Sequence, residues 1–217
     1  SFTRSPIQIT KKIFDNFINN GGHFVLTKID SIYRNGDSLF LRSNEREHQV
    51  DKIVVAAGAW SNVLARTIGD NFPLDTERGY HIIFENNSNL LAHSVGWAKT
   101  GFYMTPMEDG IRAAGTVEIA GLKKPMNNNM LTMIEATARS ILPQLGKVKS
   151  QWMGFRPTLP DSLPVIGESQ KCKNVYYAFG HQHLGLSLAA VTGKTIRSLI
   201  ENKATNINIE PLNPYRF

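Results

Sequence analysis

The stretch that most constrains the fold is Asn174–Ile200, where a short apolar run leads through a glycine-containing turn into an amphipathic segment. The apolar run, Val175–Phe179, has the length and the β-branched and aromatic content of a buried strand. After Gly180 and His181–Leu184, apolar residues recur mostly at three- and four-residue steps, which predicts a helix from Gly185. Such a strand–turn–helix unit aims backbone N–H groups at one point that suits a phosphate, a carboxylate or a carbonyl edge. An ordinary strand–helix connection in an α/β core is the alternative.

Length and composition exclude several classes of protein. The 217 residues, 41% hydrophobic and 19% charged, suffice for one domain or two small ones with a real core. The sequence has no apolar run of membrane-spanning length and no signal-peptide pattern. The lone Cys172 fits a reducing compartment, so a cytoplasmic location is expected. The net charge of +6 is spread along the chain, which argues against a nucleic-acid partner and leaves peripheral association with the inner membrane open.

The first part of the chain combines helix and strand patterns. Apolar residues between Ile7 and Ile18 predict an amphipathic helix that ends at Asn19–Gly22. Three strands are expected next, with a hairpin turn at Arg34–Asp37: His23–Ile29, Asp37–Arg42 and His48–Val55. The third strand runs into small residues, after which Ser61 is expected to cap a helix that ends near Ile68. Small residues after a buried strand let a bulky ligand lie against the backbone, and simple tight packing is the alternative.

From Pro73 the pattern changes to short strands separated by Gly and Asn, which predicts an antiparallel sheet. The expected strands are Thr76–Phe84, Ser94–Lys99, Phe102–Pro106 and Gly110–Glu118. A helix over Asn127–Leu142 and a returning strand over Lys147–Phe155 follow. The three prolines of Arg156–Gly167 then predict an irregular, rigid loop.

Several motifs together resemble the flavin-dependent D-amino-acid oxidase and dehydrogenase superfamily. They are ERGYH, GFYMTP, GFRPTLPDSLPVIG and AFGHQHLGLSLAAVTGK, in that order after VVAAGAWS. The likeness is greatest to bacterial D-amino-acid dehydrogenases, including those for cyclic imino acids, and covers essentially the whole chain. It implies FAD as cofactor and an α/β fold with an α+β insertion. Residues 1–72 and 157–217 would belong to a Rossmann-like FAD-binding domain, and residues 73–156 would form an antiparallel-sheet substrate domain.

One expected motif is absent from the sequence. The family begins with a strand–GxGxxG–helix unit that holds the FAD pyrophosphate, and this spacing does not occur here. The chain is therefore expected to be a fragment that needs a GxGxxG-bearing N-terminal half, and to be inactive by itself.

The resemblance assigns four residues to the substrate. Arg156, in the G-x-R-P motif, would bind the substrate carboxylate, because a guanidinium can donate two parallel hydrogen bonds to it. A structural arginine paired to Asp161 is the alternative. Tyr103, in GFYMTP, would help to hold the same carboxylate, so Arg156 and Tyr103 are the expected catalytic residues. Tyr80 and His81 are expected to line the same pocket, with a packing tyrosine and a hydrogen-bonded structural histidine as the alternatives.

The resemblance also assigns cofactor contacts. The residues expected to meet the flavin or its ribityl chain are Gly58, Trp60, Gly167, Gly180, His181, Leu184 and Gly185. The family's turn reads G-H-G-x-x-G, and its N–H groups face the flavin's pyrimidine carbonyls; Gln182 replaces the middle glycine here. His181 and His183 are badly spaced for zinc and have no other ligand type close by in the sequence, so no metal is expected.

The expected activity is hydride transfer from a D-amino or imino acid to FAD, with oxygen or a quinone as the electron acceptor. Two other interpretations remain open. One is a non-catalytic domain that binds a small anion or metabolite at the same helix end. The other is a subunit that completes its FAD site with a partner chain.

Overall fold

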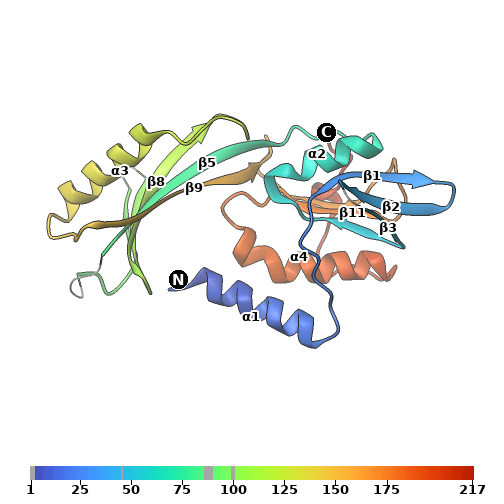
Figure 1. Ribbon diagram of the computed structural model, residues 1–217, viewed down its shortest axis with the longest axis horizontal. Helices are drawn as coiled ribbons and strands as arrows, with labels where there is room; N and C mark the ends of the chain where they lie inside the picture. The colour runs from blue at the N-terminus through green and yellow to red at the C-terminus, as the bar shows by residue number, and fades with distance from the viewer. Residues whose placement is uncertain (1–2, 45, 86–89, 99–100) are drawn as a thin grey trace. The chain divides into compact units, whose positions relative to one another are not determined.

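The computed structural model describes residues 3–44, 46–85, 90–98 and 101–217 (Figure 1). Residue contacts divide the chain into two compact units. Unit 1 comprises Ser1–Leu26, Arg78–Glu118 and Lys123–Gly154, and unit 2 comprises Thr27–Glu77, Ile119–Leu122 and Phe155–Phe217. The expected substrate domain, residues 73–156, has nearly the limits of the central part of unit 1. Residues 1–26, which were predicted to belong to the FAD-binding domain, are grouped with this sheet unit by their contacts. The assignment of domains stays a prediction.

Unit 1 is built on a five-stranded sheet of order β6-β7-β8-β5-β9. The strands are β5 (Asp75–Phe84), β6 (Val95–Trp97), β7 (Phe102–Met107), β8 (Gly110–Ile119) and β9 (Val148–Thr158). Because side chains alternate along a strand, Tyr80, Ile82 and Phe84 of β5 all point to one face. There they form a core with Leu131 and Ile134 of helix α3 (Asn128–Ile141), which covers this sheet face (Figure 1).

Helix α1 (Pro6–Asn19) joins unit 1 through its N-terminal end. The backbone N–H of Glu108, in the β7–β8 turn, donates to the carbonyl of Arg4 at 3.1 Å. Gln8 Nε2 donates to the Glu108 carboxylate at 2.8 Å. Every residue of α1 is at least partly exposed, including Ile7 and Ile13, so its apolar stripe is left open to solvent.

Unit 2 contains two three-stranded sheets. One is antiparallel, with order β1 (Ile29–Asn35), β2 (Ser38–Ser43) and β3 (Glu47–Val50). The other has order β10 (Val165–Glu168), β11 (Val175–Phe179) and β4 (Ile53–Val55), with β4 parallel to β11. Ile32 and Leu39 of the first sheet share one core with Val175 and Tyr177 of the second.

Helical segments pack against both sheets of unit 2. The short segments η1 (Gly58–Trp60), α2 (Ser61–Ala65) and η2 (Arg66–Ile68) follow β4, and Ala65 enters the shared core. Helix α4 (Gly185–Ile200) packs Ile196 against Ile166 of β10 and Tyr176 of β11. The predicted strand–turn–helix unit therefore forms with its predicted limits.

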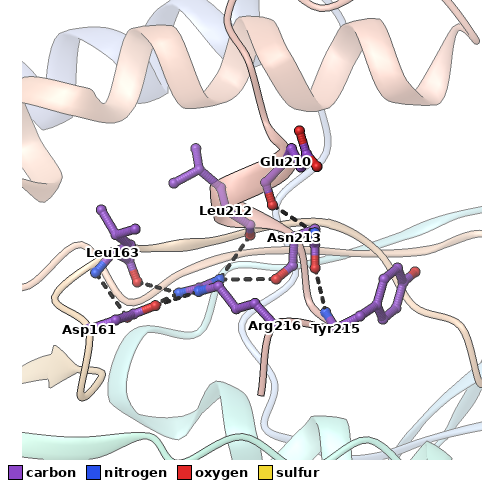
Figure 2. Close-up of polar contacts among 7 residues, drawn as sticks. All are labelled: Asp161, Leu163, Glu210, Leu212, Asn213, Tyr215 and Arg216. Carbon is purple, nitrogen blue, oxygen red and sulfur yellow. Dashed lines mark hydrogen bonds and ion pairs between the residues drawn. The ribbon is translucent and has the colours of Figure 1, made fainter.

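The C-terminal tail, which contains η3 (Glu210–Leu212), is fastened to the β9–β10 connection (Figure 2). Arg216 Nε donates to Asp161 Oδ2 at 2.6 Å, and Arg216 Nη2 donates to the Leu163 carbonyl at 2.7 Å. Arg216 Nη1 donates to the carbonyls of Leu212 and Asn213. The guanidinium of Arg216 thus links the C-terminal tail to the β9–β10 connection.

The predictions of strands at His23–Ile29 and His48–Val55 were wrong, because both depend on which neighbouring strand is available for pairing. Residues 22–28 belong to no strand, and the first strand starts at Ile29. A strand needs a neighbour to bond, whereas Leu26 is 91% exposed. The expected strand His48–Val55 is two strands, since β3 pairs with β2 and β4 pairs with β11. The alternation of apolar residues continues across this change of sheet, so it cannot reveal the break.

Two predictions near the expected sites also need correction. Arg156–Thr158 continue β9, and only the middle of Arg156–Gly167 is irregular before β10 begins. A proline is tolerated in β9 because this is an end strand of its sheet. Ser61 is the first residue of α2, and Trp60 occupies the N-cap without a side-chain capping bond.

Candidate functional site

The turn between β11 and α4 has a backbone shape that most side chains avoid. Gly180 has φ +87° and Gln182 has φ +48°, in the left-handed region. The N–H of Gln182 donates to the carbonyl of Pro157 at 3.1 Å, which ties the turn to the end of β9. The structure thus brings the G-H-x-x-x-G turn and the R-P motif together within unit 2.

A cavity of about 330 Å³ lies beside this turn. Its walls come from β4 and the residue after it, from β11, and from one face of α4: Val54, Ala56, Ala178, His181, Gly185, Ala189 and Gly193 are among them. A Cβ atom at Gly193 would meet nothing within 4 Å, so the helix presents bare backbone to the cavity. This shape admits a flat ligand close to the helix start.

His181, one of the predicted cofactor residues, lines this cavity. Its Nε2 lies 3.0 Å from Thr192 Oγ1, a hydrogen bond that fixes the ring. Burial lowers the pKa of His181, so the imidazole is neutral at physiological pH. Leu184, beside it, is 58% exposed at the N-cap of α4.

The other predicted cofactor residues lie elsewhere in unit 2. Gly58 has φ +55° with open space at its Cβ position, and Trp60 packs edge-on against Phe155 at 5.2 Å between ring centroids. Gly167 is buried, and a Cβ there would come within 2.6 Å of Pro214 Cδ. The close approach that requires this glycine is therefore to the chain's own tail.

Arg156 is half-buried near the end of β9. Its Nη1 is buried and has no hydrogen-bond partner among the described residues. Burial lowers the pKa of the guanidinium, and the charge of Glu77 partly opposes this. The alternative that Arg156 pairs with Asp161 is wrong, because the Asp161 carboxylate is bound by Arg216.

The sequence analysis did not identify the contact between His183 and Glu77, which is also the residue whose charge acts on Arg156. His183 Nε2 lies 3.4 Å from Glu77 Oε2, so an ionisable pair joins the turn to the start of β5. The two residues are far apart in the sequence, and no spacing rule connects them. The sequence analysis considered His183 only as a possible zinc ligand, and that argument gave no indication of this contact.

The other predicted substrate residues belong to unit 1. Tyr80 is buried, and its hydroxyl donates to Glu118 Oε2 at 2.5 Å and accepts from the N–H of Asn127 at 3.2 Å. Tyr103 is 57% exposed on β7. The roles of both residues toward a substrate stay predictions.

His81 lines a cavity of about 650 Å³ in unit 1, together with Arg4, Arg112 and Trp152. The His81 and Trp152 rings stack with centroids 4.8 Å apart. Burial, helped by the charge of Arg112, lowers the pKa of His81 to about 4. Neutral imidazole is thus the form that this cavity contains at pH 7.

Two searches of the described residues gave no result. None of the helices there is long and apolar enough to cross a membrane. In the same part of the chain, no cluster of three or more His, Cys, Asp or Glu side chains has an arrangement that could hold a metal ion.

Comparison with known proteins identifies the family. Residues 3–199 match the family described as FAD dependent oxidoreductase. The chain is 34% identical over 221 residues to a D-amino-acid oxidase of Bradyrhizobium diazoefficiens, covering 99% of this chain and 52% of that protein. It is 28% identical over 181 residues to a D-amino acid dehydrogenase of Vibrio atlanticus, covering 82% of this chain and 43% of that protein. The chain thus spans about half the length of these relatives.

A solved structure agrees on the fold. The L-proline dehydrogenase from P. horikoshii superposes with a TM-score of 0.86 at 21% identity, covering 98% of this chain and 59% of that one. The predicted α/β fold class, the predicted superfamily and FAD as the family's cofactor are confirmed. The chain belongs to the family of FAD-dependent oxidoreductases.

Proposed function

We propose that this chain carries the substrate site and part of the flavin site of an enzyme that oxidises a D-amino or imino acid. The observation that carries the proposal is the Nη1 of Arg156, which is buried and has no hydrogen-bond partner in the part of the chain that the structure describes. A buried charged donor without an acceptor costs about 1–3 kcal/mol or more, so such a group is kept where a ligand supplies the acceptor. A substrate carboxylate is the acceptor that matches a guanidinium best.

The substrate class is supported by the relatives, whose names include D-amino-acid oxidase and D-amino acid dehydrogenase. An amino or imino acid presents the carboxylate that Arg156 needs. The substrate roles of Tyr103, Tyr80 and His81, all in unit 1, stay predictions, and Tyr80 and His81 are neighbours on β5 whose side chains point to opposite faces of the sheet. Positioning of the substrate is the main task of these side chains, because the cofactor carries the redox chemistry.

The residues present fit part of a flavin. The cavity of about 330 Å³ beside the β11–α4 turn has a bare-backbone wall at Gly193 and accommodates one portion of a dinucleotide cofactor. His181 and Gly185, which line this cavity, are proposed to hold this portion. The cofactor contacts predicted for Gly58, Trp60, Gly167, Gly180 and Leu184 stay predictions. FAD, when bound, supplies the hydride acceptor. The N–H groups of the β11–α4 turn would favour negative charge on the cofactor edge beside them.

The remaining portion of the cofactor is proposed to lie on a GxGxxG-bearing segment outside this chain. β4 is an end strand of its sheet, and Val54 on it is 41% exposed. An end strand offers unpaired N–H and C=O groups to a further strand. The segment comes either from the same polypeptide or from a partner chain.

Substitution of Arg156 tests the substrate role. In the flavin-loaded enzyme, Arg156→Ala is expected to raise the apparent substrate constant roughly 10- to 100-fold, the effect of losing charged hydrogen bonds. Arg156→Lys should recover only part of this, since an ammonium cannot bind a carboxylate through two parallel bonds. The matched control is Arg197→Ala on α4, whose guanidinium is exposed and paired to Glu201. Unchanged kinetics in Arg156→Ala would refute the assignment.

A further inference from the structure

The pair formed by Glu77 and His183 lies beside the arginine assigned to the carboxylate. Glu77 Oε2 is 3.4 Å from His183 Nε2. Glu77 also acts electrostatically on Arg156, where its negative charge stabilises the guanidinium. No ion pair within 4 Å joins Glu77 to Arg156 among the described residues, so the interaction between them is a longer-range one.

Two features of the backbone keep this arrangement in place. Gln182 holds its left-handed conformation and bonds to Pro157, which fixes His183 one residue after a point tied to β9. Glu77 lies on β5, and its side chain is 26% exposed. Arg156 and Glu77 lie on β9 and β5, which are neighbours in one sheet.

The two charged groups each retain bonding capacity. The Nη1 of Arg156 lacks an acceptor, and Glu77 Oε1 has no donor among the described residues. A carboxylate accepts several hydrogen bonds, so Oε1 is free for a ligand while Oε2 faces His183. The site therefore offers a donor for an anion and an acceptor for a cation next to each other.

We propose that Glu77, oriented by His183, binds the amino group of an α-amino acid whose carboxylate is bound by Arg156. This inference rests on the proposed function and deepens it, because it adds a second recognition element. It selects zwitterions, in which an ammonium and a carboxylate are attached to the same carbon. A plain carboxylate would satisfy Arg156 and leave Glu77 without a partner.

A surface ion pair with no ligand role is the competing explanation. Such a pair contributes about 0–1 kcal/mol to stability, and its loss would change no ligand preference. The discriminating quantity is therefore the ratio of affinities for two ligands that differ only in the amino group. D-Alanine with propionate, and D-proline with cyclopentanecarboxylate, are two such pairs.

The experiment measures the affinity of the assembled, flavin-loaded enzyme for both members of each pair by titration calorimetry and by NMR chemical shifts, with the flavin kept reduced so that no substrate is turned over. Glu77→Gln is nearly isosteric and removes the negative charge. It is expected to weaken binding of the amino-acid members roughly tenfold, the effect of losing one charge-assisted hydrogen bond. Binding of the plain carboxylates should stay unchanged or become up to a few-fold tighter, since Glu77 no longer repels an anion.

His183 is a positioning residue, and conservative replacement tests this role. His183→Gln retains a donor toward Glu77 and should keep most of the preference for the amino acid, whereas His183→Ala should lose much of it. Glu85→Gln, which removes a carboxylate just after β5, is the matched control and should change neither affinity.

The outcomes separate this proposal from the proposed function. If Arg156→Ala abolishes binding of both members while Glu77→Gln weakens both equally or neither, the carboxylate site stands and the amino-group site is overturned. If the unsubstituted, flavin-loaded enzyme binds neither member, both proposals fail. Selective loss of the amino-acid member in Glu77→Gln supports both.

Discussion

At the residue scale, the chain contains two arginines buried in different ways. Arg78 is fully buried, donates to the Pro125 carbonyl at 2.8 Å and has its Nη1 3.6 Å from Glu118. Arg156 is half-buried and keeps one nitrogen without an acceptor. Arg78 is therefore part of a structural network, whereas Arg156 is the arginine proposed to bind a ligand. Both occur next to predicted strand residues, so sequence context alone does not separate these two roles.

The His81 imidazole gives a pH-dependent prediction at this scale. Its pKa of about 4, against a usual 6.5, means that the unfolded chain binds more protons than the folded one between these values. The stabilisation associated with neutral His81 is thus complete above pH 6.5 and is lost as the pH falls toward 4. NMR titration should show a midpoint near 4, and Arg112→Gln should raise it because a repelling charge is removed. A midpoint at 6.5 in the unsubstituted protein would contradict this burial.

At the scale of elements, a predicted strand forms only where its backbone N–H and C=O groups find a neighbouring strand to bond. This requirement explains both the correct and the incorrect strand predictions. β11 and α4 form as predicted because the apolar run and the helical periodicity lie within one continuous stretch. Residues 22–28 do not form a strand, although their pattern suits one, because pairing depends on a neighbour elsewhere. Arg216 shows the opposite situation: it joins the C-terminal tail to Asp161 and Leu163, although no pattern in the sequence near either segment predicts the contact (Figure 2).

The β7–β8 turn provides a prediction at this scale. Gly110 has φ +149°, and a Cβ atom there would come within 2.2 Å of the Phe84 carbonyl oxygen. Gly110→Ala is therefore expected to destabilise unit 1 by about 2–4 kcal/mol, from backbone strain plus displacement of β5. Gly101→Ala, at φ +62° with no atom within 4 Å of the added Cβ, should cost only about 1 kcal/mol. Urea unfolding compares the two, and equal losses would exclude the clash as the cause.

At the scale of the whole molecule, each unit has its own apolar core. Phe84 and Ile134 belong to the core of unit 1, whereas Val175 and Tyr177 belong to that of unit 2. The proposed substrate residues are divided between the units, with Tyr103 in one and Arg156 in the other. Unit 2 also has the cavity of about 330 Å³, which is lined by Val54 of the end strand β4. Catalysis is thus expected of the assembled enzyme.

Flavin binding tests this expectation. The chain alone, mixed with excess FAD and dialysed, should retain no visible flavin absorption. Co-expression with the part of the Bradyrhizobium diazoefficiens relative that this chain does not cover should restore a retained flavin band. Val54→Lys, which places a charge on the exposed face of β4, should prevent this restoration and leave the fold intact. Retention of FAD by the chain alone would show that the cavity suffices, and tight amino-acid binding without any flavin requirement would favour a non-catalytic binding domain.

The amino-acid sequence by itself determined the local elements and the family. The apolar periodicities of α1, α3 and α4 and the turn at Gly36 depend on neighbouring residues, so they can be read along the chain. The motifs around Arg156 and Gly180 likewise identified the family and its cofactor. The tertiary structure alone decided that Asp161 pairs with Arg216, that Tyr80 bonds to Glu118, and that Glu77 meets His183. These contacts join distant segments whose meeting depends on strand pairing and core packing, and no local pattern encodes that meeting.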